Sequence, residues 1–181
     1  MNKIAGVLTP VILGAATAFF ALKRYRFDRE KARYERDTDV LKWVQECMGV
    51  IGDIEIFSVI PDKYLSSSKD RAAGLSKAIS KLSILVDFGR MHFPNHFEGE
   101  YGVHKESAFR GIRHPILDAL LEFHDLALRN LREEKMTEWA DLNRLRREFV
   151  SHVQEAIEPR RRIQFLSKEA YVQHNRANGV R

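Results

Sequence analysis

The spacing of apolar and charged residues divides the sequence into an uncharged N-terminal run and a longer amphipathic part. From Ile4 to Leu22, nineteen consecutive residues carry no charge. Beyond Leu22, apolar residues recur every three or four positions between charged ones, which is the spacing of amphipathic helices. The pattern therefore predicts one apolar helix followed by several helices that share a core.

The uncharged run has the length of a membrane-spanning helix. Nineteen residues at 1.5 Å each give about 28 Å, close to the roughly 30 Å hydrocarbon core of a bilayer. Pro10 and Gly14 are tolerated in such helices, because no water competes for the backbone there. We expect residues 1–22 to be a transmembrane anchor. The alternatives are a cleaved signal peptide with its cleavage site at residues 16–18 and a buried helix of a soluble protein.

The basic residues around this run predict its orientation. Lys3 alone precedes it, whereas residues 23–36 contain seven Lys or Arg residues. Because cationic residues stay on the cytoplasmic side, we expect a single-pass protein of a bacterial inner membrane, with its N-terminus outside and its C-terminal domain in the cytoplasm. After signal-peptide cleavage the same cations would open the mature chain and oppose export, which favours the anchor.

A seven-residue spacing predicts that the first helix continues past the anchor. Two lines of apolar residues have this spacing, Phe27, Tyr34, Leu41 and Met48, and Val44 with Ile51. This seam either packs in the protein's own bundle, which we favour, or forms a coiled coil with another chain. Residues 54–60 alternate like a strand, but no partner strand is evident, so we expect the helix to reach Pro61.

Three further helices are predicted downstream. Periodicity and capping residues place them at about 66–89, 115–135 and 137–157, with Ser66–Ser68 as N-caps of the first. Pro159 then bends the chain into a tail. The expected fold class is all-α, a cytoplasmic antiparallel bundle of about four helices with one long irregular loop.

The net charge of +5 is carried by the flanks of the bundle. We expect a basic stalk at 23–36, with seven basic and three acidic residues, and a basic tail at 159–181, with six and one. The helical bundle domain at 37–158 has sixteen basic and twenty-one acidic residues. An antiparallel bundle returns the tail to the membrane, where each cation contributes about 1 kcal/mol on anionic lipid.

The candidate lipid-surface residues are Lys23, Arg24, Arg26, Arg160, Arg161 and Arg162. Nucleic acid is the less favoured partner, because lipid accounts for these cations at least as well. The single cysteine, Cys47, lies among apolar residues, so we expect a buried thiol in a reducing compartment. No Walker loop, dinucleotide glycine pattern, HExxH or nucleophile elbow occurs, so neither an enzyme nor a cofactor is indicated.

The connection from Gly89 to Pro115 is too long for a simple bundle loop, and loops of this length tend to be functional. The candidate metal ligands in it are His92, His96, Glu98 and His104. Pro94 prevents the first two histidines from sharing a helical face, and no known ligand pattern is matched. We therefore favour a loop without metal, with hydrogen-bonded histidines. The expected anchors of that loop are Phe93, Phe97 and Tyr101.

The same connection is a candidate site for an anion or a partner. Its cations are Arg90, Lys105, Arg110 and Arg113. Gly111 allows close backbone approach, so a phosphate, a nucleotide or a lipid headgroup fits this pattern. The alternative, which we favour, is intramolecular pairing with acidic residues on one face of the next helix, Asp118, Glu122 and Asp125.

Short motifs in this connection carry a resemblance. They are Gly89-Arg90-Met-His-Phe-Pro-Asn95, Tyr101-Gly102, Lys105 and Ala108-Phe109-Arg110-Gly111. Over about 25 residues the pattern resembles uncharacterised small bacterial proteins, some of them membrane-anchored. The resemblance implies no activity, but it implies that this loop is the distinctive surface.

Together these patterns predict a membrane-tethered helical interaction module that meets anionic lipid and either a protein partner or further copies of itself. The alternative is an oligomeric membrane effector whose single spans assemble into a pore, with the bundle as its regulator. No catalytic residue and no cofactor-binding residue is predicted.

Overall fold

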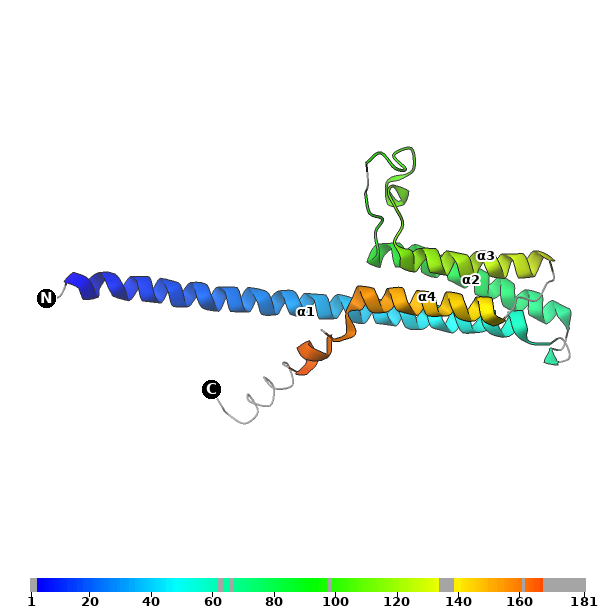
Figure 1. The fold of residues 1–181 in the computed structure, drawn as a ribbon, viewed down its shortest axis with the longest axis horizontal. Helices are drawn as coiled ribbons and strands as arrows, with labels where there is room; N and C mark the ends of the chain where they lie inside the picture. Colours follow the sequence, from blue (N-terminus) through cyan, green and yellow to red (C-terminus); the bar gives the residue numbers. More distant parts are fainter. Residues whose placement is uncertain are drawn as a thin grey trace. The chain divides into compact units, whose positions relative to one another are not determined.

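The computed structural model describes residues 3–61, 64–65, 67–97, 99–133, 139–160 and 162–167. The side chains of residues 3–13, 15, 68 and 133 lie outside this description. The helices are α1 (Lys3–Val59), α2 (Ser68–His92), the short 3-10 helix η2 (Ser107–Phe109), α3 (Pro115–Glu133) and α4 (Trp139–Ile157) (Figure 1). The described residues contain no β-strand, so the all-helical prediction is confirmed.

The chain forms two compact units. The flank unit contains residues 1–39 and 159–181, and the bundle unit contains residues 40–158. Helix α1 contributes to both, with residues 3–39 in the flank unit and 40–59 in the bundle unit. Each unit has contacts of its own and is described by itself.

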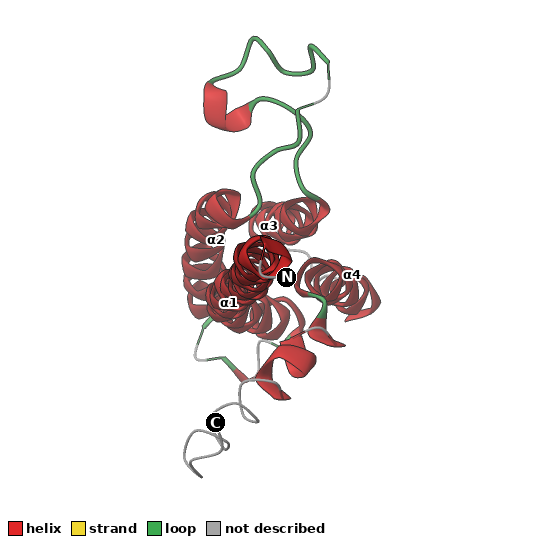
Figure 2. Ribbon diagram, turned by 90° about the vertical axis from the view of Figure 1, so that its left-hand side faces the viewer, coloured by secondary structure: helices red, strands yellow, loops and turns green. Residues whose placement is uncertain are grey.

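Four helices form the bundle unit, with the second part of α1 beside α2, α3 and α4 (Figure 2). The ends of α1 and α3 lie with the starts of α2 and α4 at one end of the bundle, so the arrangement is antiparallel (Figure 1). The predicted helical bundle is confirmed. Its largest fully buried side chains include Phe123, Phe149, Ile51, Ile54 and Leu82.

The buried face of α1 lies one residue from the predicted seam. The buried positions follow a three- and four-residue spacing through Val40, Trp43, Cys47, Val50 and Ile54. The predicted line is only partly buried at Leu41 and Met48. Both lines repeat every seven residues, so that spacing alone does not separate two faces 100° apart. Ile51, from the second predicted line, is fully buried.

Gly89 does not end α2, as its sequence position suggested. The helix runs three residues further, to His92. A Cβ atom at Gly89 would lie 2.6 Å from Leu117 Cδ2 and 2.6 Å from Trp43 Cζ2, far inside van der Waals contact. The glycine is therefore a packing residue that lets α1, α2 and α3 approach one another.

The other predicted helix ends are mostly close. Helix α1 ends at Val59, so residues 54–59 are helical and the strand alternative is wrong. Ser67 holds the N-cap position of α2 without a side-chain hydrogen bond to the helix. Lys135 and Thr137, the expected boundaries between α3 and α4, lie outside the described residues.

At the end of the bundle where α1 and α3 stop, the polar side chains find partners within the protein. Arg71 Nη1 donates a 2.6 Å hydrogen bond to the carbonyl of Phe57, and Arg71 Nη2 donates to the carbonyl of Ile60. A buried hydrogen bond of 3.0 Å runs from Asn130 Nδ2 to Ser58 Oγ. Carbonyls at a helix C-terminus lack intrahelical donors, so Arg71 closes the end of α1.

One ion pair crosses the bundle from α1 to α4. Glu55 is buried, and its Oε2 lies 3.2 Å from Arg146 Nη1. Burial raises the pKa of Glu55, while the charge of Arg146 opposes the increase. Removing one partner would leave a buried charge uncompensated, so the pair fixes how α4 sits on α1.

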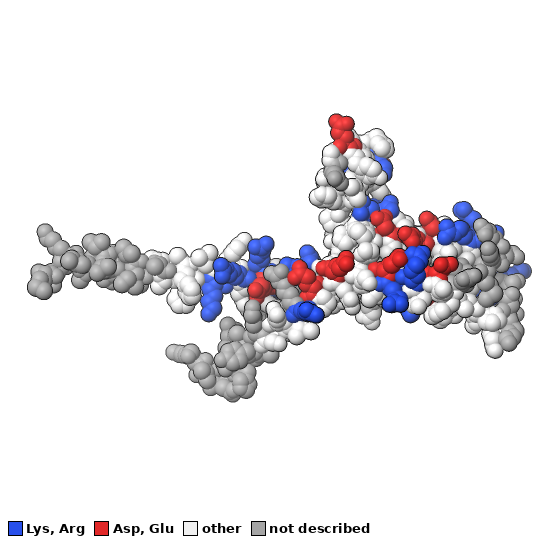
Figure 3. Space-filling model, viewed as in Figure 1, with Lys and Arg blue, Asp and Glu red and all other residues white. Residues whose placement is uncertain are grey.

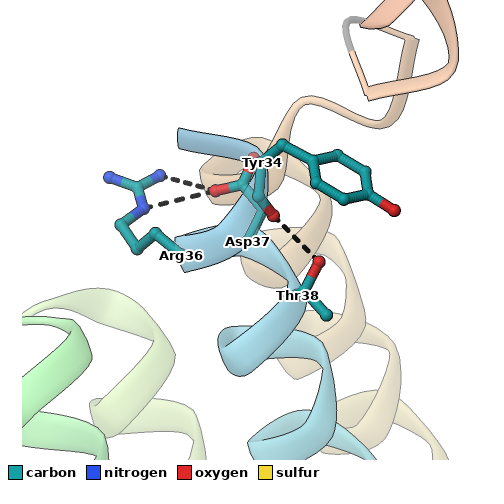
Figure 4. A network of polar contacts seen from close by, with 4 residues as sticks. All are labelled: Tyr34, Arg36, Asp37 and Thr38. Carbon is teal, nitrogen blue, oxygen red and sulfur yellow. Dashed lines mark hydrogen bonds and ion pairs between the residues drawn. The ribbon is translucent and has the colours of Figure 1, made fainter. Parts of the chain in front are cut away.

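The flank unit has a small aromatic cluster around Phe165, which is buried. Its ring stacks on Tyr34 with 5.2 Å between centroids, and the Arg162 guanidinium lies 4.5 Å from the Tyr34 centroid. The buried Asp37 carboxylate accepts two hydrogen bonds from Arg36, and Thr38 donates one to the Tyr34 carbonyl (Figure 4). These contacts order the start of the tail against α1.

Where side chains are described, none of the helices combines the length and the apolar character needed to cross a bilayer. Most side chains of the anchor predicted at residues 1–22 lie outside that part of the chain. The transmembrane anchor therefore stays a prediction.

Candidate functional site

The long loop is fixed to the bundle by one aromatic side chain. Phe93, the first residue after α2, is buried, with its ring centroid 5.7 Å from Trp43 and 4.8 Å from His114. Trp43 is itself held by a 2.8 Å hydrogen bond from its Nε1 to the carbonyl of Leu85. Phe97 and Tyr101, the other two expected anchors, are 69% and 61% exposed, so that part of the prediction is wrong.

A two-bond bridge closes the base of the loop. His96 and Ile112 exchange backbone hydrogen bonds of 2.8 and 2.7 Å in antiparallel geometry. Gly111 makes this closure possible, since its φ is +85° and a Cβ there would lie 2.3 Å from the His96 carbonyl oxygen. The Gly111 amide also donates to the Tyr101 carbonyl at 3.1 Å, which folds the tip of the loop back onto its base.

A pocket of about 500 Å³ lies between the end of α2, this loop and the start of α3. We call it the basic pocket. Its lining residues are Arg90, Asn95, Tyr101, Lys105, Glu106, Phe109, Gly111, Ile112, Arg113 and Asp118. Three cations against two carboxylates line one hollow, on a bundle domain that is acidic as a whole.

Aromatic rings and one carboxylate position these cations. The Arg90 guanidinium carbon lies 4.5 Å from the Phe109 ring centroid, and the Lys105 ammonium lies 5.6 Å from that of Tyr101. Arg113 Nη1 lies 2.8 Å from Asp118 Oδ1. Arg110, the fourth predicted cation, donates from Nε to the Lys105 carbonyl at 2.9 Å and lines a neighbouring pocket.

Three polar atoms of the basic pocket are buried without a hydrogen-bond partner in the described part of the chain. They are Arg90 Nε, Arg113 Nε and Asn95 Oδ1. Arg90 Nε lies 3.6 Å from a carboxylate oxygen of Asp87, which is an ion pair but too long for a hydrogen bond. A buried donor without an acceptor costs about 1–3 kcal/mol, so these atoms lower the stability of the fold.

The charges near the base of the loop are mixed. In Figure 3, Lys and Arg side chains lie where the loop meets the bundle, next to acidic side chains on the neighbouring helices. Asp118 neutralises part of the Arg113 charge, as the prediction of intramolecular pairing required. Asp125, another predicted partner, lies instead 3.3 Å from His124 Nδ1. Of the four loop cations, Arg113 pairs with a predicted partner, Asp118, and Arg90 forms an ion pair with Asp87 on its own helix.

His114 stands at the junction of loop and α3, where its Nδ1 accepts a 3.3 Å hydrogen bond from the Ile116 amide. Burial lowers its pKa, and the nearby His152 lowers it further. The carboxylates of Asp118 and Glu155 act in the opposite direction. A neutral imidazole suits a helix N-terminus, where a positive charge is unfavourable.

The candidate metal ligands do not converge. Across the described ranges, no group of three or more His, Cys, Asp or Glu side chains is placed to hold a metal ion. His92 lies against Trp43 at 6.1 Å, His96 contributes its backbone to the bridge, and His104 is exposed. Glu98 lies outside the described residues.

The predicted lipid-surface residues fall in the flank unit. Lys23, Arg24, Arg26 and Arg160 are exposed, and Arg161 lies outside the described residues. Arg162 is half-buried, and its guanidinium makes a cation–π contact with Tyr34.

Sequence reasoning did not identify Asn95 or Phe109 as site residues. Asn95 follows Pro94 directly after a helix end, where side-chain amides often accept backbone or ligand hydrogen bonds. Phe109 lies in the short helix η2, which no apolar periodicity marks. Only the fold of the loop brings the two beside Arg90.

Comparison with known proteins identifies no relative of this chain. No protein-family model, no curated protein and no solved structure matches the chain. The function is therefore argued from the residues of the chain alone.

Proposed function

We propose that the protein is a membrane-tethered helical interaction module whose basic pocket receives an acidic group of a protein partner. The pocket supplies two guanidinium groups and one ammonium group, with aromatic rings that hold two of them in place. Charged donors of this kind bind carboxylate and phosphate oxygens, and a guanidinium can do so through two parallel bonds.

The observation that carries this proposal is the gathering of three cationic side chains, Arg90, Lys105 and Arg113, around one pocket. The Nε atoms of Arg90 and Arg113 are buried and lack a hydrogen-bond partner in the described ranges. Elsewhere in the bundle unit, Arg71 directs its donors at backbone carbonyls. The guanidinium of Arg71 is thus used within the molecule, whereas Arg90 and Arg113 line a pocket.

The tether is supported by exposed apolar residues of α1 at the end of the predicted anchor. Phe19, Phe20 and Leu22 are 63%, 66% and 59% exposed. Exposed cations begin directly after them at Lys23. Tyr25 is exposed as well, and aromatic rings beside cations are typical of the level of lipid headgroups. Apolar side chains of this size left exposed in sequence favour a lipid environment for this part of α1.

The pocket is tested with the full-length chain in nanodiscs of zwitterionic lipid. The probe is a fluorescent hexaglutamate peptide, titrated at low and at physiological salt. We expect Arg113→Gln to weaken its binding by about tenfold, the effect of losing one charge-assisted hydrogen bond. The matched control is Arg129→Gln, which removes an exposed cation outside the pocket from α3, the helix that follows Arg113.

Two outcomes contradict the pocket proposal. Equal weakening by Arg129→Gln shows attraction by overall charge, and absence of binding removes the site. Parallel titrations with inorganic phosphate and with phosphatidylglycerol vesicles distinguish the source of the anion. Tighter binding of either one than of the peptide assigns the pocket to a small anion or to lipid, and overturns the protein partner.

The tether is tested by Gly14→Arg in the full chain. An arginine near the centre of a spanning helix costs about 2.5–3.5 kcal/mol of insertion free energy, so we expect the protein to leave the membrane fraction. Gln45→Arg, at an exposed position of α1 in the bundle unit, is the control and is expected to stay in the membrane. Wild-type protein that remains in solution without detergent contradicts the tether.

A further inference from the structure

The exposed face of α2 carries an apolar stripe. Ile84, Phe88 and Met91 follow one another at four- and three-residue spacing, so they share one side of the helix. They are 55%, 54% and 78% exposed. Large apolar side chains exposed singly are ordinary, but three in register on one helix face form a continuous apolar stripe.

The stripe continues into the loop. Met91 lines a second pocket of about 400 Å³ together with Pro94, Phe97 and Phe109. Phe97 is exposed, so it extends the apolar surface beyond the end of the helix. This pocket and the basic pocket share three lining residues, Arg90, Asn95 and Phe109. The apolar stripe and the cations of the basic pocket therefore belong to one continuous surface.

Cations lie at both ends of this surface. Lys77 and Lys81 are exposed on the same face of α2, one and two turns before Ile84. Arg90 and Arg110 line its other end at the loop. The acidic residue that lines this second pocket is Asp87. It lies on the border of the stripe, 3.6 Å from Arg90 Nε.

From this arrangement we propose that the surface binds an amphipathic helix of a protein partner, with apolar residues in its middle and acidic residues at both ends. The stripe would take apolar side chains at positions i, i+4 and i+7, and the cations would take the flanking carboxylates. A second copy of α2 is disfavoured as the occupant. In a parallel pair Lys77 and Lys81 would meet their own counterparts, and in an antiparallel pair they would approach Arg90 and Arg110.

The inference rests on the proposed function, because the acidic end of the bound helix would occupy the basic pocket. Beyond the proposed function, the inference assigns part of the affinity for the bound helix to the apolar stripe. Two synthetic helical peptides of identical composition separate the two contributions. The ordered peptide carries three leucines at i, i+4 and i+7 with glutamates at both ends, and its isomer distributes the same leucines around the helix.

The measurement is fluorescence anisotropy of each labelled peptide with the full-length chain in zwitterionic nanodiscs. We expect the ordered peptide to bind about tenfold more tightly than its isomer, and Phe88→Gln to abolish the difference. The control variant is Ile56→Gln, which removes an equally exposed apolar side chain from α1 and is expected to keep the difference.

Four outcomes overturn the proposal, and they also separate it from the basic pocket. If both isomers bind equally and Arg113→Gln weakens both, the pocket holds and the stripe fails. If neither peptide binds, both fail. If the ordered peptide binds but Arg113→Gln leaves it unchanged, the acidic complement is wrong. If Phe88→Gln converts a dimer of the chain into a monomer, a second copy is the occupant.

Discussion

The two ends of the bundle unit treat their polar groups in opposite ways. Where α1 ends, Arg71 donates to two backbone carbonyls and Asn130 donates to Ser58, so these two side chains find partners inside the molecule. At the loop end, Arg90 and Arg113 bury Nε atoms that lack hydrogen-bond partners in the described ranges. The contrast is that Arg71 uses its donors within the molecule, whereas Arg90 and Arg113 line the pocket that we propose for a ligand.

The largest effect is expected from opening the closed end. Arg71→Ala removes two charge-assisted hydrogen bonds from the last turn of α1, and we expect it to lower the free energy of unfolding by about 3 kcal/mol. Urea unfolding measures the loss. Burial raises the pKa of the Cys47 thiol to about 12, so alkylation of this thiol at neutral pH reports unfolding independently. An unchanged urea midpoint would contradict the role of Arg71.

The next effect concerns the base of the loop. Gly111→Ala places a Cβ 2.3 Å from the His96 carbonyl at a φ of +85°, so we expect the bridge between His96 and Ile112 to open. The left-handed conformation alone costs about 1–2 kcal/mol for a residue other than glycine. Hydrogen exchange of the Ile112 amide should accelerate while amides in α4 stay protected. Hexaglutamate binding should fall with it.

The third prediction tests the contrast directly. Arg113→Gln should lower the free energy of unfolding by no more than about 0.5 kcal/mol, because its pair with Asp118 is 38% and 51% exposed and screened by solvent, and the loss of its unpartnered Nε acts in the stabilising direction. The same variant should lose most of its affinity for the acidic probe. If Arg113→Gln unfolds at the same urea concentration as Arg71→Ala, the two arginines contribute equally to stability and the contrast between the two ends is wrong.

The smallest effect is a dependence on pH at the junction of loop and α3. The folded-state pKa of His114 lies below its ordinary value of 6.5, so the folded protein resists protonating it. The free energy of unfolding should be constant above pH 6.5 and fall as the pH decreases from there through the folded-state pKa. Comparing unfolding of wild type and His114→Gln over pH 5–8 isolates this contribution, which should vanish in the variant.

Much of the fold follows from local patterns in the sequence. Pro115 at the start of α3 and the periodicity of Leu142, Leu145 and Phe149 in α4 were sufficient to place those helices. The face of α1 was predicted one residue away, because Val40 and Leu41 begin equally regular seven-residue lines. Gly89 reads as a helix end because glycine is common there. Its close contact with Trp43 depends on tertiary packing, which a single sequence position does not reveal.

The candidate site was predictable in composition but not in geometry. Charge and loop length pointed to Arg90, Lys105 and Arg113, which the fold gathers around one pocket. The aromatic rings under Arg90 and Lys105 were not foreseen in this role, because cation–π pairs join residues with no fixed spacing. The stripe on α2 is not predictable from the sequence, because periodicity identifies apolar helix faces but does not show which of them remain exposed in the fold.

The bridge between His96 and Ile112 has an evolutionary consequence. Two hydrogen bonds join the ends of the segment to each other and Phe93 packs its base on Trp43, so residues between the bridge ends can be exchanged or lengthened at little entropic cost. Selection can thus retune what the tip recognises while the helices beneath it stay constant. The bundle would then be a scaffold on which new binding preferences arise by grafting a single segment.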